Sequence, residues 1–126
     1  MVDQQAEMTI RRATWCDQAA EALHAAARGD LDLIAAQCRH QVSDLWRIEG
    51  RAEGWLVTRQ EPGELVIVAG AGRNCRPVIR HITARAIAAG LSVRVHLVRP
   101  GLKRIYEAEG FGFAEYVLRK GHGRQQ

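Results

Sequence analysis

The clearest pattern of hydrophobic positions lies in the middle of the chain, where two apolar runs flank one amphipathic segment. Leu65–Ala69 and Leu91–Val98 are rich in β-branched residues, as strands are. Between them, the break at Gly70–Gly72 is followed by apolar residues at helical spacing up to Gly90: Val78, Ile79, Ile82, Ala86 and Ala89. Strand, glycine turn, helix and strand in this order predict a βαβ unit with parallel strands and a right-handed crossover.

The first third of the chain predicts one strand and two helices. Met8–Arg12 is a strand candidate, and Thr14 followed by Asp17 resembles a helix cap in front of an alanine-rich run that ends before Gly29. Asp30 can cap a second helix, whose apolar side is formed by Leu31, Ile34, Ala35 and Cys38.

From Ser43 onward the pattern changes to strict alternation, which predicts strands. Trp46 and Ile48 are expected on one face, and Leu45, Arg47 and Glu49 on the other. Gly54–Arg59 is the next strand candidate, and Glu61-Pro62-Gly63 has the composition of a tight turn. Together with Leu65–Ala69 these segments predict a three-stranded antiparallel meander.

The end of the chain predicts one short helix and one strand. The helix is expected from about Leu102 to Glu109, and the strand over Phe113–Leu118. The predicted order is therefore β-α-α-β-β-β-α-β-α-β, an α/β (α+β) fold with one mixed sheet and helices on both faces. We expect a single domain over residues 1–126, with frayed tails at 1–7 and 120–126.

Composition limits the class of protein. Of the 126 residues 47% are hydrophobic, and no apolar run approaches the ~18 residues of a membrane span. The polar N-terminus does not resemble a signal peptide, so a cytoplasmic protein is expected. Three cysteines without a CxxC pair indicate neither a disulfide framework nor a zinc site, and Cys16 and Cys38 are expected to be buried thiols.

Charge and chain order together predict an anion site. The net charge is +4 and the isoelectric point is about 9.4, which suits an anionic ligand. In a βαβ unit the turn Gly70–Cys75 and the start of the following helix lie together at the carboxyl end of the first strand. Free backbone N–H groups and the helix dipole favour anions there, and Arg73 and Arg76 add positive charge.

Three segments, in the right order along nearly the whole chain, resemble the GNAT family of acyl-CoA-dependent N-acetyltransferases. Ile10-Arg11-Arg12-Ala13-Thr14 with Asp17 resembles the family's first strand and its entry into the first helix. The central βαβ stretch lies where the family binds its cofactor. The segment Ile105-Tyr106-Glu107-Ala108-Glu109-Gly110-Phe111 is similar to the family's LYEKxGF motif.

The resemblance implies a specific chemistry. In the family, the strands equivalent to Leu65–Ala69 and Leu91–Val98 splay apart and hold the pantetheine arm of acetyl-CoA between them. The diphosphate rests on the loop before the long helix. Tyr106 would protonate the departing thiolate, and Glu64, or alternatively Glu61 or a relayed water, would accept a proton from the amine. The residues that this implies for the cofactor are Val66, Val68, Gly70, Gly72, Arg73, Asn74, Cys75, Arg76 and Arg99.

The chain departs from the family pattern at two points. Counted back from Gly90, the family's R/Q-x-x-G-x-G/A diphosphate motif falls on Gly70–Cys75, with Arg73 and Cys75 in the two glycine positions. Arg99 replaces the asparagine that usually precedes the tyrosine by seven residues. Asn74 could still cap the helix, and Pro77 is tolerated in its first turn.

Three functions therefore stay open. The first is an acetyl-CoA-dependent N-acetyltransferase that acts on a small-molecule or protein amine. The second is a non-catalytic GNAT-fold module, because Arg99-Pro100-Gly101 with Lys103-Arg104 also resembles small phage-encoded GNAT-like proteins, some of them virion components. Such a protein could be virion-associated and could act as a homodimer or with an assembly partner.

The third is another kind of nucleotide binding, which a partial match of Gly70–Cys75 to the dinucleotide fingerprint suggests. The basic face of the long helix, with Arg76, Arg80 and Arg85, is interpreted as solvated rather than as a nucleic-acid patch. An enzyme predicts an open cleft between the splayed strands, and a module predicts a cleft filled by side chains.

Overall fold

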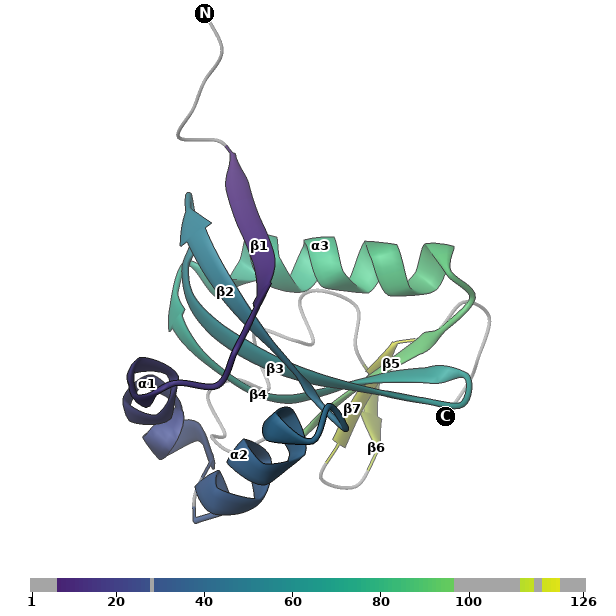
Figure 1. The fold of residues 1–126 in the computed structure, drawn as a ribbon. Coiled ribbons are helices and arrows are strands. Elements are labelled where there is room, and N and C mark those ends of the chain that lie inside the picture. The colour runs from purple at the N-terminus through teal and green to yellow at the C-terminus, as the bar shows by residue number, and fades with distance from the viewer. Residues whose placement is uncertain (1–6, 28, 97–111, 115–116, 121–126) are drawn as a thin grey trace, which may run out of the picture.

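The computed structural model describes residues 7–27, 29–96, 112–114 and 117–120 (Figure 1). The elements, in chain order, are β1 (Met8–Ala13), α1 (Asp17–Ala27), α2 (Leu31–Arg39), β2 (Asp44–Gly50), β3 (Glu53–Glu61), β4 (Glu64–Arg73), α3 (Cys75–Ala88), β5 (Ser92–His96), β6 (Gly112–Ala114) and β7 (Val117–Lys120). The predicted helix from Leu102 to Glu109 lies outside the described residues. Within these residues no helix is both long enough and apolar enough to cross a membrane.

The described strands form one mixed sheet in the order β1-β2-β3-β4-β5-β7-β6. Strands β2–β4 form the three-stranded antiparallel meander, β1 pairs with β2 in the antiparallel sense, β4 and β5 are parallel, and β5 pairs with β7 in the antiparallel sense. The mixed sheet, the meander and the parallel βαβ unit are all as the sequence predicts.

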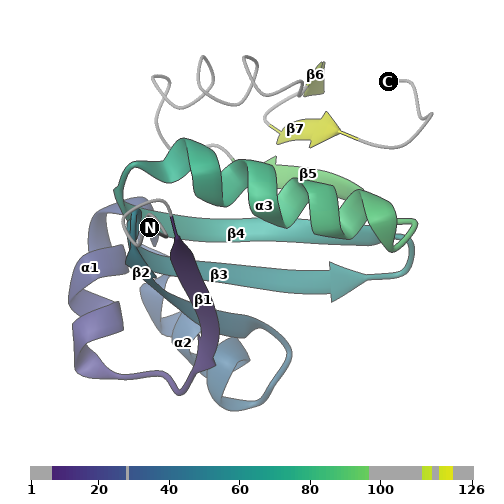
Figure 2. The ribbon, with the colours of Figure 1, turned by 90° about the horizontal axis from the view of Figure 1, so that it is seen from above.

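Helices cover both faces of the sheet, as Figures 1 and 2 show: α3 lies on one face, and α1 and α2 lie on the other. Each face has its own core. Ile48, Leu56, Ile67, Val93 and Val95 pack with Val78, Ile79 and Ala86 of α3. Leu45, Val57 and Ala69 pack with Ala19, Leu23, Ala27 and Ile34 of the other two helices.

The alternation in β2 places its side chains on the predicted faces. Trp46 packs against the α3 core and Leu45 lies in the core under α1 and α2.

Cys16 and Cys38, which are predicted to be buried, are only partly buried and pack against the core under α1 and α2. Burial nevertheless raises the pKa of the Cys38 thiol to about 11, with a further contribution from Asp44.

Three predicted boundaries are wrong. Gly70-Ala71-Gly72 does not break the strand, because all three residues pair with Leu56, Trp55 and Gly54 of β3 and β4 continues to Arg73. The single strand predicted over Phe113–Leu118 is two short strands, β6 and β7, which pair with each other. Lys120, expected in the terminal tail, is the last residue of β7.

Candidate functional site

Strands β4 and β5 pair over only part of their length. Their parallel register runs from Glu64 opposite Ser92 to Ile67 opposite Val95. The structure describes β5 as far as His96, and β4 continues to Arg73. Among the described residues, the register between β4 and β5 therefore covers Glu64–Ile67, and Val68–Arg73 extend beyond it.

A β-bulge in β4 lies where this pairing ends. Val57 of β3 pairs with Ala69, but Thr58 pairs with Ile67, so Val68 is an extra residue in β4. A bulge bends its strand and increases the local twist. It also shifts the alternation of side chains: Ile67 lies in the α3 core, whereas Ala69 lies in the core under α1. The bulge therefore bends β4 at the residue where its described pairing with β5 ends.

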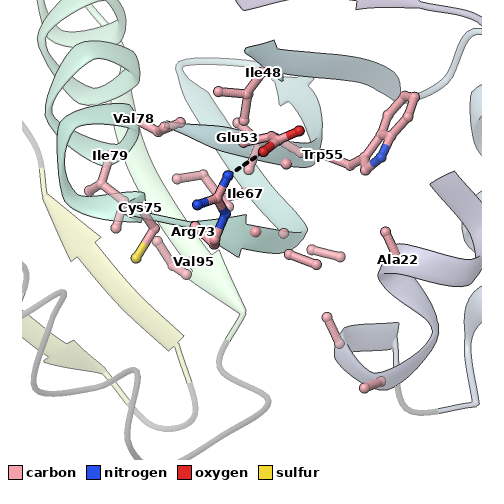
Figure 3. A pocket seen from close by; sticks show the side chains of 18 residues that line it. Ala22, Ile48, Glu53, Trp55, Ile67, Arg73, Cys75, Val78, Ile79 and Val95 are labelled. Carbon is pink, nitrogen blue, oxygen red and sulfur yellow. Dashed lines mark hydrogen bonds and ion pairs between the residues drawn. The ribbon is translucent and has the colours of Figure 1, made fainter. Parts of the chain in front are cut away.

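A cavity of about 250 Å³ lies beside the part of β4 that follows the bulge (Figure 3). Its lining comes from both faces of the sheet, so the gap connects the two sides. The α3 side contributes aliphatic residues and the α1 side contributes mostly alanines. The residues that line the cavity are Ala22, Ala25, Ala26, Ile48, Glu53, Gly54, Trp55, Leu56, Ile67, Ala69, Gly70, Ala71, Gly72, Arg73, Cys75, Val78, Ile79 and Val95.

Two glycines at the edge of this cavity face each other across β3 and β4. Gly54 and Gly72 are register partners, and a Cβ atom on Gly72 would lie 2.1 Å from the backbone oxygen of Glu53. A Cβ atom on Gly54 would lie 2.1 Å from the backbone oxygen of Ala71. The backbones of β3 and β4 therefore approach so closely at this pair that only glycine, which has no Cβ atom, fits at either position.

Charged side chains surround the next register pair, Glu53 and Arg73. The two form an ion pair, which Figure 3 shows as a dashed line. Arg47 binds the other carboxylate oxygen of Glu53 at 3.4 Å, donates to the Gly54 carbonyl at 3.1 Å and lies 4.8 Å from the centre of the Trp55 ring. The hydrogen bond and the charge of Arg73 lower the pKa of Glu53, and Arg47 contributes further.

Helix α3 begins at Cys75, and Asn74 is its N-cap residue between Arg73 and the helix. Asn74 adopts a left-handed conformation (φ 58°, ψ 53°) and makes no side-chain cap. Its side-chain amide donates instead to the Arg51 carbonyl at 2.9 Å, which ties the helix start to the turn between β2 and β3. The expected cap is therefore absent, while Pro77 does lie in the first helical turn and Cys75 lines the cavity. Arg76, Arg80 and Arg85 are exposed, as expected for a solvated face.

The structure brings together some predicted site residues and separates others. Gly70, Gly72, Arg73 and Cys75 line the cavity. Val66 is fully buried in the paired part of β4, and Val68 is the bulge residue. Glu64 lies at the opposite end of β4, roughly 20 Å of extended strand from Gly70, and its carboxylate is 3.6 Å from Arg94. Tyr106 and Arg99 lie outside the described residues.

The β3 and α1 side of the site was not predicted from the sequence. Glu53, Trp55 and the exposed alanines Ala22 and Ala25 all line the cavity. The available sequence signal is Gly54, the first residue of the predicted strand, because a glycine in a strand can mark close approach of another backbone. Within the described ranges no three His, Cys, Asp or Glu side chains gather closely enough to hold a metal ion.

No family model and no curated protein match this sequence, but solved structures do. A Bacillus subtilis acetyltransferase in complex with CoA has a TM-score of 0.67 at 13% identity, with 90% of this chain and 96% of that chain covered. A GNAT family acetyltransferase from Elizabethkingia anophelis with acetyl-CoA bound has a TM-score of 0.66 at 15% identity, with 86% of this chain and 78% of that chain covered. The AtaT-AtaR complex bound to DNA has a TM-score of 0.61 at 14% identity, with 89% of this chain and 93% of that chain covered. The chain described above has the fold of the GNAT acetyltransferases.

Proposed function

We propose that this protein is an N-acyltransferase that transfers an acetyl group from acetyl-CoA to an amine. The observation that carries the proposal is the cavity beside β4 beyond its described pairing with β5, because residues from both faces of the sheet line it. A two-substrate transfer needs the thioester carbon and the amine nitrogen to be held together in one site, and such a cavity offers room for both substrates. The solved structures with CoA or acetyl-CoA bound support this choice of donor.

The proposed donor site uses the backbone of β4 beyond the bulge. Among the described residues, β5 pairs with β4 as far as Ile67, so the N–H and C=O groups that point away from β3 beyond the bulge are the ones proposed to bind the amides of a pantetheine arm. Ile67, Val78, Ile79 and Val95 give the cavity an apolar wall on the α3 side. The diphosphate is placed at the start of α3, where Arg73 and Arg76 supply positive charge together with the helix dipole.

The proposed reaction is direct attack of the amine nitrogen on the thioester carbonyl. A C–N bond forms, the C–S bond breaks and the thiolate takes a proton from Tyr106, whose phenol suits this role because its pKa lies near 10 in water. Glu64 is too distant for direct proton transfer at the cavity. We therefore assign the amine's proton to a relayed water.

The proposed acceptor site is on the α1 side. Ala22, Ala25 and Ala26 present small side chains to the cavity, and Trp55 adds an aromatic wall. A shallow apolar surface of this kind suits an amine that carries an apolar group, either a small molecule or the end of a polypeptide.

Calorimetric titration with acetyl-CoA tests the proposal, beside the same titration of Tyr106→Phe and an assay of CoA release with a panel of amines. Both proteins are expected to bind acetyl-CoA, and the variant is expected to turn over at least about 100-fold more slowly, since it has lost its general acid. No heat from the parent protein at millimolar acetyl-CoA would contradict the proposal and favour a non-catalytic module.

A further inference from the structure

We infer that Glu53 is a positioning residue that competes with the acyl donor's diphosphate for Arg73, and so sets the affinity for the donor. This inference rests on the proposed function. Arg73 lines the cavity and lies two residues before the first residue of α3, and its guanidinium is paired with the Glu53 carboxylate. A carboxylate and a phosphate are alternative partners for the same guanidinium fork.

The geometry makes Glu53 the fixed member of the pair. Its second carboxylate oxygen is held by Arg47 at 3.4 Å, and Arg47 is itself fixed by the Gly54 carbonyl and the Trp55 ring. Only 21% of the Arg47 side chain is exposed. Glu53 therefore presents its remaining oxygen from a rigid support at the start of β3.

Arg73 is the mobile member. Its side chain is 80% exposed, so its long aliphatic part can change rotamer in solvent. It can leave Glu53 without moving the strand, and ion pairs this exposed are released at low cost. When the diphosphate occupies the start of α3, Arg73 must give up Glu53 to bind it, so donor binding is weakened by the free energy of the pair.

The chain offers a matched control. Glu49 lies in β2 and is paired with Arg11 at 3.4 Å and with Arg47 at 3.7 Å, so it belongs to the same charged cluster. Arg73, however, is paired with Glu53. Glu49→Gln therefore removes the same charge from the same neighbourhood without releasing Arg73.

The experiment compares the affinities of the parent protein, Glu53→Gln and Glu49→Gln for two ligands, acetyl-CoA and acetylpantetheine, by calorimetry. The second ligand carries the same acyl arm without phosphate. Glu53→Gln is expected to bind acetyl-CoA about two- to fivefold more tightly, the size expected for an exposed ion pair, and acetylpantetheine equally well. Glu49→Gln is expected to match the parent protein with both ligands. The effect of Glu53→Gln is expected to vanish in an Arg73→Gln background.

Unchanged or weaker acetyl-CoA binding by Glu53→Gln would overturn the inference while leaving the proposed function standing. An equal gain in affinity for acetyl-CoA in both glutamate variants, or a gain that persists without Arg73, would also overturn the inference. The cause would then be the loss of one negative charge and not the release of Arg73. Failure of the parent protein and of every variant to bind acetyl-CoA would refute the proposed function itself. A thermal melt of each variant checks that the exposed substitutions leave the fold intact.

Discussion

At the scale of single residues, two glycines that line the cavity, Gly70 and Gly72, meet different constraints although they lie only two positions apart. Gly72 faces Gly54 across the strands, where a side chain would collide with backbone. A Cβ atom on Gly70 would instead meet the side chain of Leu56 at 3.2 Å, and a side chain can rotate away. The sequence analysis treated both glycines as one turn, because nothing local distinguishes a turn from close cross-strand approach.

Gly72→Ala is expected to lower the free energy of unfolding by at least about 2 kcal/mol, since two backbones would have to separate. Gly70→Ala is the control and is expected to change it by under about 1 kcal/mol. Urea unfolding of both variants measures the difference. Equal costs for the two substitutions would mean that the strands do not approach as described.

At the scale of elements, the site is made where β4 passes into α3. The order of strands and helices over the described residues follows from periodicity in the sequence, because each element has an apolar face that must be buried. The bulge at Val68 and the length of β4 could not be predicted in this way. Both depend on register with β3, a long-range property that no local pattern carries.

The start of α3 gives an element-scale prediction through Asn74. Asn74→Ala is expected to lower the free energy of unfolding by about 1–2 kcal/mol, because alanine resists the left-handed conformation and loses the bond to Arg51. Asn74→Gly keeps that conformation and loses only the bond, so a smaller cost, under about 1 kcal/mol, is expected. Chemical denaturation of the two variants separates the two contributions, and an alanine variant as stable as the glycine variant would argue against a left-handed Asn74.

At the scale of the whole molecule, the sheet brings three distant segments to one cavity. Helix α1 supplies small residues, the start of β3 supplies Glu53 and Trp55, and the β4–α3 junction supplies Arg73 and Cys75. The family resemblance predicted the third segment, because its strand-loop-helix order is local in sequence. It did not predict the first two, which reach the cavity only through the meander's pairing.

The central claim is that acetyl-CoA binds between β4 and β5, and amide chemical-shift mapping of this 14.0 kDa chain tests it most directly. On titration with acetyl-CoA, the largest shifts are expected over Val68–Arg73, the first turn of α3 and Val95. Shifts centred on the far end of β4, around Glu64 and Arg94, or the absence of any shift at millimolar acetyl-CoA, would contradict the claim.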